Sequence, residues 1–317
     1  MTSTPQDPPL GFSISPNACF WWATQTGNYP DAYPEGTLWA PLRGRTGQRV
    51  DHWETLNGVR PGDVVLHYVA PEIRGISQAA TVPAPAYPPL RGYQEPADTD
   101  GVLVLTEPLS EVRIPWNLVA DALPRASGPL TVDKELRRGF FFGVDRDAAL
   151  SLLQRAGLAI TEHPGGARGS VVPSGQYLGG HSDRWALGAV RTEQQYLRNQ
   201  QLQLRGSSCS LCGQSFPDEL LVAAHIKPRS ECSEEERIDT RNVCMVACLF
   251  GCDALFERGY LVVGDEGTIE SGKPAPGQVG GRVRELLGRI RLAHDERSRD
   301  YFVWHREHHQ DRFAPQS

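Results

Sequence analysis

Two closely spaced cysteine pairs constrain the fold of this 317-residue chain more than any other feature of its sequence. Two residues separate Cys209 from Cys212, and three separate Cys248 from Cys252. Each such pair can form a tight turn that supplies two thiolates to a tetrahedral zinc ion. The spacing therefore predicts a structural zinc site made by all four cysteines. Cys244 lies close enough to Cys252 to replace Cys248, and the sequence leaves this alternative open.

The distribution of cysteine favours metal binding over disulfide formation. Of seven cysteines, all but Cys19 lie between Cys209 and Cys252. The start of the chain lacks the basic residues and apolar stretch of a signal peptide, so we expect a cytoplasmic protein, where disulfides are rare. We expect the isolated Cys19 to be a small buried apolar residue.

Hydropathy argues against a membrane-spanning protein, and charge argues against a uniformly basic nucleic-acid-binding protein. No apolar run reaches the roughly 18 residues that a membrane-spanning helix needs, so we expect no membrane partner. A net charge of −6 and a pI of about 5.9 are not those of a uniformly basic nucleic-acid-binding protein. A local basic surface can still exist on an acidic chain.

Gly/Pro-rich segments predict two domains. Residues 1–16 have the composition of a disordered tail, and residues 17–160 contain short strands between turns, such as 19–24, 63–69 and 102–106. A helix with Asp145 as its N-cap and Gly157 at its end closes this region. Residues 161–182 have the composition of a linker, and a helix begins the second domain, residues 183–317.

Three polar residues accompany the cysteine pairs. His225 lies in the apolar segment Leu-Leu-Val-Ala-Ala-His-Ile, Asn242 follows, and Asp253 comes directly after Cys252. A histidine in an apolar strand is usually a packed core residue. Its position between two metal-binding pairs instead favours a role as a base beside a metal site.

This pattern resembles the HNH, or ββα-metal, endonuclease family, in its McrA-like branch, over roughly residues 185–313. The matching motifs are Cys209-x₂-Cys212, Ala224-His225-Ile226, Asn242, and Cys248-x₃-Cys252-Asp253 followed by Leu-Phe-Glu-Arg-Gly-Tyr.

The resemblance implies that His225 activates water, Asn242 orients it, and Asp253 binds a catalytic Mg²⁺ or Mn²⁺. This chain departs from the family at two positions. Ala224 stands where another metal ligand often precedes the base, and Asp253 stands where histidine is more usual.

The first domain resembles the EVE domains, which have a PUA-like β-barrel fold, over roughly residues 17–158. The matching segments are 20–25 (Phe-Trp-Trp-Ala-Thr-Gln), 36–41 (Gly-Thr-Leu-Trp-Ala-Pro) and 59–68. The resemblance implies a pocket in which aromatic rings stack on a modified base. The candidates are Trp22, Trp39, Trp53 and Tyr68 for stacking, and Thr24 and Gln25 for hydrogen bonds. Aromatic residues in a small β-domain are, alternatively, core residues.

Together these features predict an α+β protein in which a base-reading domain is joined to a zinc-containing nuclease domain. The expected function is that of a type IV-like endonuclease. It would flip 5-methylcytosine or 5-hydroxymethylcytosine out of double-stranded DNA, cut nearby, and act as a homodimer. No Gly-x₄-Gly-Lys-Ser/Thr motif is present, so we expect no nucleotide cofactor. Two alternatives remain: a non-catalytic, zinc-containing nucleic-acid-binding regulator, and a nuclease that acts on unmodified DNA.

Overall fold

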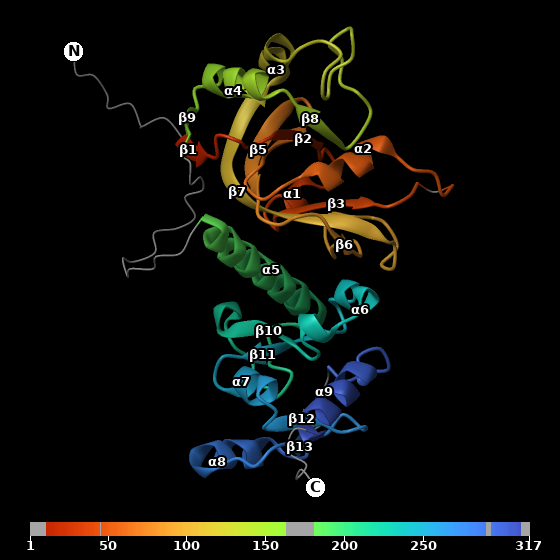
Figure 1. Cartoon of the computed structure of the whole chain (residues 1–317), viewed down its shortest axis with the longest axis vertical. Coiled ribbons are helices and arrows are strands. Elements are labelled where there is room, and N and C mark those ends of the chain that lie inside the picture. Colours follow the sequence, from red (N-terminus) through yellow and green to blue (C-terminus); the bar gives the residue numbers. More distant parts are fainter. Residues whose placement is uncertain (1–10, 45, 163–180, 290–292, 312–317) are drawn as a thin grey trace, which may run out of the picture. The chain divides into compact units, whose positions relative to one another are not determined.

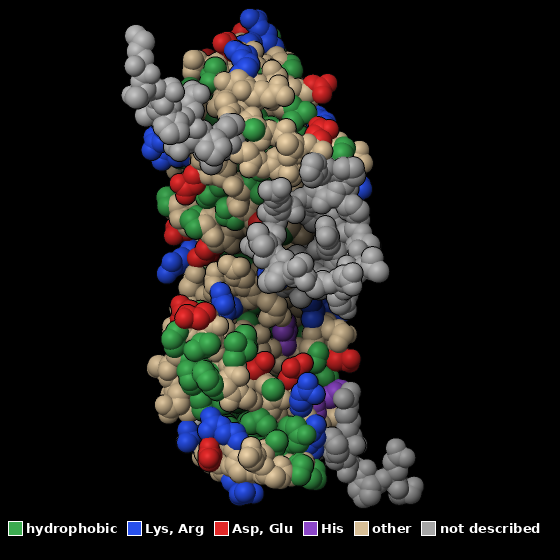
Figure 2. Space-filling view, turned by 90° about the vertical axis from the view of Figure 1, so that its left-hand side faces the viewer, with side chains coloured by type: hydrophobic (Ala, Val, Ile, Leu, Met, Phe, Trp, Pro, Cys, Tyr) green, Lys and Arg blue, Asp and Glu red, His purple; other side chains and the backbone are tan. Residues whose placement is uncertain are grey.

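A computed structural model describes residues 11–44, 46–162, 181–289 and 293–311. The chain has a mixed α+β fold and divides into two compact units, Met1–Glu193 and Gln194–Ser317. None of the helices in the described ranges is long and apolar enough to cross a membrane. On the face drawn in Figure 2, Lys and Arg side chains alternate with Asp and Glu rather than forming one large basic area.

A curled sheet of seven strands forms the N-terminal unit (Figure 1). Its order is β3 (Thr37–Pro41), β7 (Gly101–Pro115), β5 (Glu72–Ala79), β4 (Val64–Val69), β2 (Phe20–Thr24) and β8 (Phe141–Val144), with β6 (Ala84–Ala86) also paired to β7. Neighbouring strands are antiparallel except β2 and β4.

Register shifts between β5 and β7 accompany the curvature of these two strands, because bulges increase the local twist. The described residues show no pairing between the edge strands β3 and β8. The sheet is therefore a half-barrel, whereas the sequence predicted a β-barrel.

Alternating side chains divide the apolar core of this unit between the two faces of the sheet. In β4, Val64 and Leu66 belong to the larger cluster, and Val65 belongs to the smaller one. This follows from the two-residue period of a strand. Helices α3 (Trp116–Ala122) and α4 (Arg146–Arg155) pack on the larger cluster.

The predicted ends of α4 are confirmed. The Asp145 carboxylate accepts a hydrogen bond from the Ala148 N–H at 2.9 Å. Gly157 follows the helix with a φ of +80°, a conformation that glycine adopts without steric cost.

The structure corrects three predictions for this unit and its borders. Residues 11–14 were predicted as disordered, but β1 (Gly11–Ile14) pairs in parallel with β9 (Ala159–Glu162), and Ile14 is fully buried. The predicted linker begins two residues too early, because 161 and 162 belong to β9. Its last two residues belong to α5 (His181–Arg205), and 163–180 lie outside the described residues. Cys19 was predicted to be buried and is exposed.

The described part of the C-terminal unit contains two short antiparallel hairpins and the helices that pack on them. One hairpin is β10 (Leu221–His225) with β11 (Cys244–Cys248), and the other is β12 (Leu261–Val263) with β13 (Ile269–Ser271). Helix α7 (Cys252–Glu257) contacts β10, β11 and β12, whereas α9 (Arg299–Asp311) contacts β12 and α8 (Gly277–Leu286) contacts β13. The remaining short helices are α1 (Tyr29–Ala32), α2 (Asp51–Glu54), η1 (Thr55–Gly58), η2 (Asp218–Leu220), η3 (Arg229–Glu231) and α6 (Glu234–Ile238).

Three hydrogen-bonded, buried polar side chains in the N-terminal unit predict how its stability depends on pH. His67 is 1% exposed, with Nδ1 2.5 Å from Gln25 Oε1 and Nε2 2.6 Å from Ser77 Oγ. Burial lowers the pKa of His67 to about 3. Above pH 6.5 this histidine is neutral in both folded and unfolded chains. Below that pH the unfolded chain binds the proton first, so the folded state loses stability.

We expect the free energy of unfolding of this unit to fall by about 3 kcal/mol through His67 between pH 6.5 and pH 4. Denaturant titrations of wild type and His67→Gln at several pH values measure this contribution. The His67→Gln variant should show a correspondingly weaker pH dependence. Equal slopes for the two proteins would contradict the assignment.

Candidate functional site

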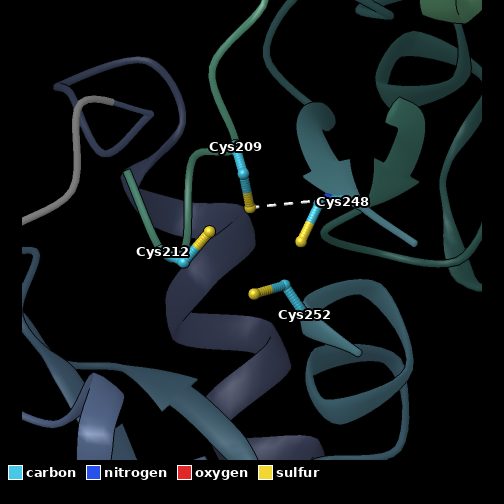
Figure 3. A group of neighbouring side chains, drawn as sticks. All are labelled: Cys209, Cys212, Cys248 and Cys252. Carbon is cyan, nitrogen blue, oxygen red and sulfur yellow. Dashed lines mark hydrogen bonds between the residues drawn. The ribbon is translucent and has the colours of Figure 1, made fainter. Parts of the chain in front are cut away.

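Four cysteine sulfur atoms converge in the C-terminal unit (Figure 3). The Sγ atoms of Cys209, Cys212, Cys248 and Cys252 lie within 4.8 Å of one another, and all four residues are buried. They come from the turn before η2, the end of β11 and the start of α7. This is the predicted set of four. Cys244 is not in the group, because it lies at the opposite end of β11, across from His225.

Two glycines allow the tight turns that carry these thiols. Gly213 directly follows Cys212 with a φ of +73°, and its N–H donates to the Cys209 carbonyl at 2.9 Å. Gly251 precedes Cys252 with a φ of +102° and is the N-cap of α7. Both conformations are in the left-handed region that favours glycine. The two turns orient the thiols toward a common centre.

The geometry and electrostatics of the cluster fit a zinc ion. Zn–S bonds of about 2.3 Å in a tetrahedron separate sulfur atoms by about 3.8 Å, which is within the observed spread. A hydrogen bond from the Cys252 thiol, supported by backbone N–H groups, lowers the pKa of Cys209 to about 5. One of those groups is the Cys248 N–H, 3.4 Å from Cys209 Sγ. Burial raises the pKa of Cys212, and the hydrogen bond with Cys209 raises the pKa of Cys252. The lowered pKa therefore belongs to Cys209, and the thiolate is the form that binds zinc.

The hairpin and helix beside this cluster form a ββα unit. Strands β10 and β11 are antiparallel, and α7 begins four residues after β11 and contacts both strands. His225 is the last residue of β10 and is paired with Cys244. Asp253 is in the first turn of α7. Ala224, the departure noted in the sequence, is 6% exposed and pairs with Met245.

The environment of His225 suits a neutral imidazole. The residue is partly buried, and this burial lowers its pKa below the ordinary 6.5. The backbone hydrogen bonds between the two strands continue one residue beyond His225, since the Ile226 N–H donates to the Val243 carbonyl at 2.8 Å. His225 is thus held at the end of an ordered ladder and is uncharged at neutral pH, as a general base must be.

Asn242 is held by Asp239, which Tyr301 holds in turn. Its Nδ2 donates to Asp239 Oδ1 at 2.7 Å, and the Tyr301 hydroxyl of α9 donates to Asp239 Oδ2 at 2.9 Å. Gln201 Nε2 donates to the carbonyls of Thr240 and Arg241 at 2.9 and 3.1 Å. The loop 239–242 is therefore clamped between α5 and α9 directly before β11. The sequence carries no local signal for Tyr301, which is 62 residues from Asp239.

A second carboxylate lies on the same helix as Asp253. Glu257 follows it by four residues on α7, a spacing that places two side chains on one helix face. Burial, and then the negative charge of Glu257, raise the pKa of the Asp253 carboxyl. Both carboxylates offer oxygen ligands of the kind that Mg²⁺ and Mn²⁺ prefer. The four-residue spacing in the sequence could have identified Glu257.

The structure does not bring the six predicted base-pocket residues into one open cage. Trp22 is fully buried and stacks on Tyr68 at 4.9 Å in the larger core cluster. Its Nε1 donates to Thr24 Oγ1 at 3.1 Å. Trp39 is 2% exposed, and its Nε1 donates to the Ala86 carbonyl at 2.9 Å. These three aromatic residues pack as core residues do.

The other two predicted pocket residues differ in accessibility. Gln25 is 1% exposed, and its side chain is hydrogen-bonded to His67. Trp53 is only partly buried and lines a hollow of about 520 Å³.

No family model and no curated protein matches this sequence. The solved structures that match this chain include the following three, each of which aligns with less than half of it. The YTH domain of Pho92 in complex with m6A is 8% identical, with a TM-score of 0.32, over 45% of this chain and 88% of that chain. The YTH domain of Zygosaccharomyces rouxii MRB1 protein in complex with N6-methyladenosine RNA is 10% identical, with a TM-score of 0.30, over 46% and 91%. A hypothetical protein from Leishmania major is 13% identical, with a TM-score of 0.30, over 44% and 95%.

Proposed function

We propose that this protein is a DNA endonuclease that depends on a base modification and on a divalent metal ion. The observation that supports this most is the ββα unit beside the four cysteines. It carries a neutral, partly buried His225 at the end of β10 and two carboxylates, Asp253 and Glu257, on α7. This combination of a near-neutral base with acidic metal ligands is suited to phosphodiester hydrolysis.

In the proposed reaction, His225 accepts a proton from water as the water oxygen bonds to phosphorus. The P–O bond to the leaving sugar oxygen then breaks, and that oxygen takes a proton from solvent. Asp253, with Glu257 one turn later, would hold Mg²⁺ or Mn²⁺. Such a cation stabilises negative charge on the phosphate oxygens. Asn242, fixed by Asp239 and Tyr301, holds the segment that pairs with the end of β10.

The zinc ion has a structural role in this proposal. Four thiolates fill a tetrahedral coordination shell and leave no position for water or substrate. The ion would hold the turn at Cys209, the end of β11 and the start of α7 together. It would thereby set the distance between the base and the acidic helix.

We propose that the N-terminal unit supplies the specificity by accepting a modified cytosine, 5-methyl or 5-hydroxymethyl, that is flipped out of double-stranded DNA. Flipping costs a few kcal/mol, which stacking on an aromatic side chain partly offsets. Each chain has one proposed catalytic site, which favours cleavage of the two strands by two copies, so we propose that a homodimer acts on the duplex.

Digestion of otherwise identical linear DNA containing cytosine, 5-methylcytosine or 5-hydroxymethylcytosine tests this function. We expect cleavage of one or both modified substrates with Mg²⁺ or Mn²⁺, and none with EDTA. Cleavage of all three at equal rates would instead indicate a nuclease that ignores modification. Binding without cleavage under every metal condition would indicate a non-catalytic regulator.

A further inference from the structure

An open hollow in the N-terminal unit lies beside the smaller core cluster. It has a volume of about 520 Å³, within the range of roughly 300–1,000 Å³ that is usual for small-molecule sites. Its walls are formed by the end of β3, Leu42, Arg43, Arg49, α2, η1 and Val102 of β7. The lining residues used below are Arg43, Arg49, Trp53, Glu54 and Asn57.

Trp53 gives this hollow an aromatic wall that is held in place. Its ring packs on the smaller core cluster and makes an edge-to-face contact with His52, with centroids 5.7 Å apart and planes at 84°. His52 is itself fixed, since its Nδ1 accepts a hydrogen bond from the Phe140 N–H at 3.1 Å. A partly buried, anchored indole is suited to stack on a planar ligand.

The polar groups around Trp53 are of the kinds that bind the phosphate and the base edge of a nucleotide. Arg43 Nη1 donates to the Gly47 carbonyl at 3.1 Å, and Arg49 Nε lies 3.4 Å from Glu54 Oε1. A guanidinium has five N–H donors, so each arginine has others to offer to a phosphate. The exposed carboxamide of Asn57 presents both a donor and an acceptor, as the edge of a base does.

A second hollow, of about 570 Å³, is less suited to this ligand. Its aromatic residue, Tyr29, already stacks on Tyr33 at 4.9 Å, and its hydroxyl donates to the Arg74 carbonyl. Its two arginines, Arg74 and Arg113, both pair with Glu72. In the first hollow the indole stacks on no ring among the described residues.

We infer that the hollow beside Trp53 receives one flipped nucleotide of the modified strand. The base stacks on Trp53, the Asn57 carboxamide contacts the edge of the base, and Arg43 and Arg49 contact the phosphate. This inference rests on the proposed function, because it assigns the recognition step of that function to a particular site. It moves that site away from the buried Trp22, Trp39 and Tyr68.

Photocrosslinking tests the position of the base directly and needs no variant. The full chain is irradiated with a duplex carrying one 5-iododeoxycytidine, without Mg²⁺ or Mn²⁺, and the crosslinked peptide is identified by mass spectrometry. We expect the crosslink on Trp53 or a neighbour within residues 52–57. A crosslink confined to Trp22, Trp39 or Gln25 would overturn the inference.

Affinity measurements with the full chain supply a second test. We expect Trp53→Ala to weaken binding of the modified duplex about tenfold or more and to abolish the preference over plain duplex. Asn57→Ala and Arg49→Ala alter exposed side chains, so we expect them to change binding at the site without destabilising the fold. Each should weaken binding several-fold. The matched control is Arg113→Ala, since Arg113 and Arg49 are 79% and 75% exposed and each pairs with a glutamate.

The outcomes separate this inference from the proposed function. If wild type shows no preference for modified DNA, the reader function itself fails, and the inference fails with it. If wild type shows the preference and all three variants retain it at unchanged affinity, only the assignment to this hollow fails. Equal losses in Arg49→Ala and Arg113→Ala would also overturn the phosphate contact.

Discussion

Replacing His225 with alanine is expected to lower the rate of DNA cleavage by two to four orders of magnitude while leaving the affinity for DNA nearly unchanged. Removal of a positioned general base typically costs about 10²–10⁴-fold in rate. The side chain lies at the end of β10, so its loss leaves the paired backbone of the hairpin intact. Single-turnover cleavage and equilibrium binding, measured on the same substrate, check the two halves of this prediction.

The pH dependence of cleavage provides a further check on His225. Burial lowers its pKa, so the neutral, active form persists below pH 6.5. The acid limb of kcat/KM should therefore have its midpoint below pH 6.5, because protonation removes the base only there. His308→Ala is a suitable control in the same unit, since His308 has no part in the proposed site. Cleavage by His225→Ala at the wild-type rate would place the base elsewhere.

Loss of the zinc ion is expected to unfold the C-terminal unit rather than only slow its chemistry. Structural zinc sites contribute apparent binding free energies of about 10–16 kcal/mol near neutral pH, comparable to or larger than the stability of a whole domain. The four thiols are buried and come from three separate segments, which a bound zinc ion would join. Cys209→Ala, or a strong chelator, should abolish the cooperative unfolding transition of this unit.

Cys244→Ala is the matched control for the zinc prediction. Cys244 is as buried as Cys248 but lies outside the four-sulfur group. This variant should retain one zinc per chain and lose only the stability expected from a small cavity. Elemental analysis together with thermal unfolding of both variants measures these effects. Absence of zinc from a folded wild-type protein, or loss of zinc from Cys244→Ala alone, would contradict the assignment.

Features that depend on a few neighbouring residues were predictable from the sequence. The two cysteine pairs come together as their spacing indicated, because a tight turn orients both thiols of a pair at once. The N-cap at Asp145 and the end of α4 near Gly157 follow from local hydrogen bonding and backbone freedom. The choice of Cys248 over Cys244 depends on which end of β11 faces the other pair, and the sequence leaves that open.

Features that depend on long-range pairing were not predictable from the sequence. The hydrogen bond between Tyr301 and Asp239 joins α9 to a loop 62 residues away. Neither residue type indicates that the two side chains meet. Strand β1 was predicted as disordered because four residues near a terminus have too little pattern. It is ordered through pairing with β9, which lies 148 residues later in the chain.

The sequence by itself determined the residue types of the two halves: four thiols at metal-binding spacing, and a domain rich in tryptophan and tyrosine. The tertiary structure decided which aromatic residues face the core and which face a hollow. Core residues cover both faces of the sheet, so Trp22 of β2 and Trp39 of β3 are buried. Trp53 belongs to the short helix α2, outside the sheet, and therefore lies at the wall of the hollow.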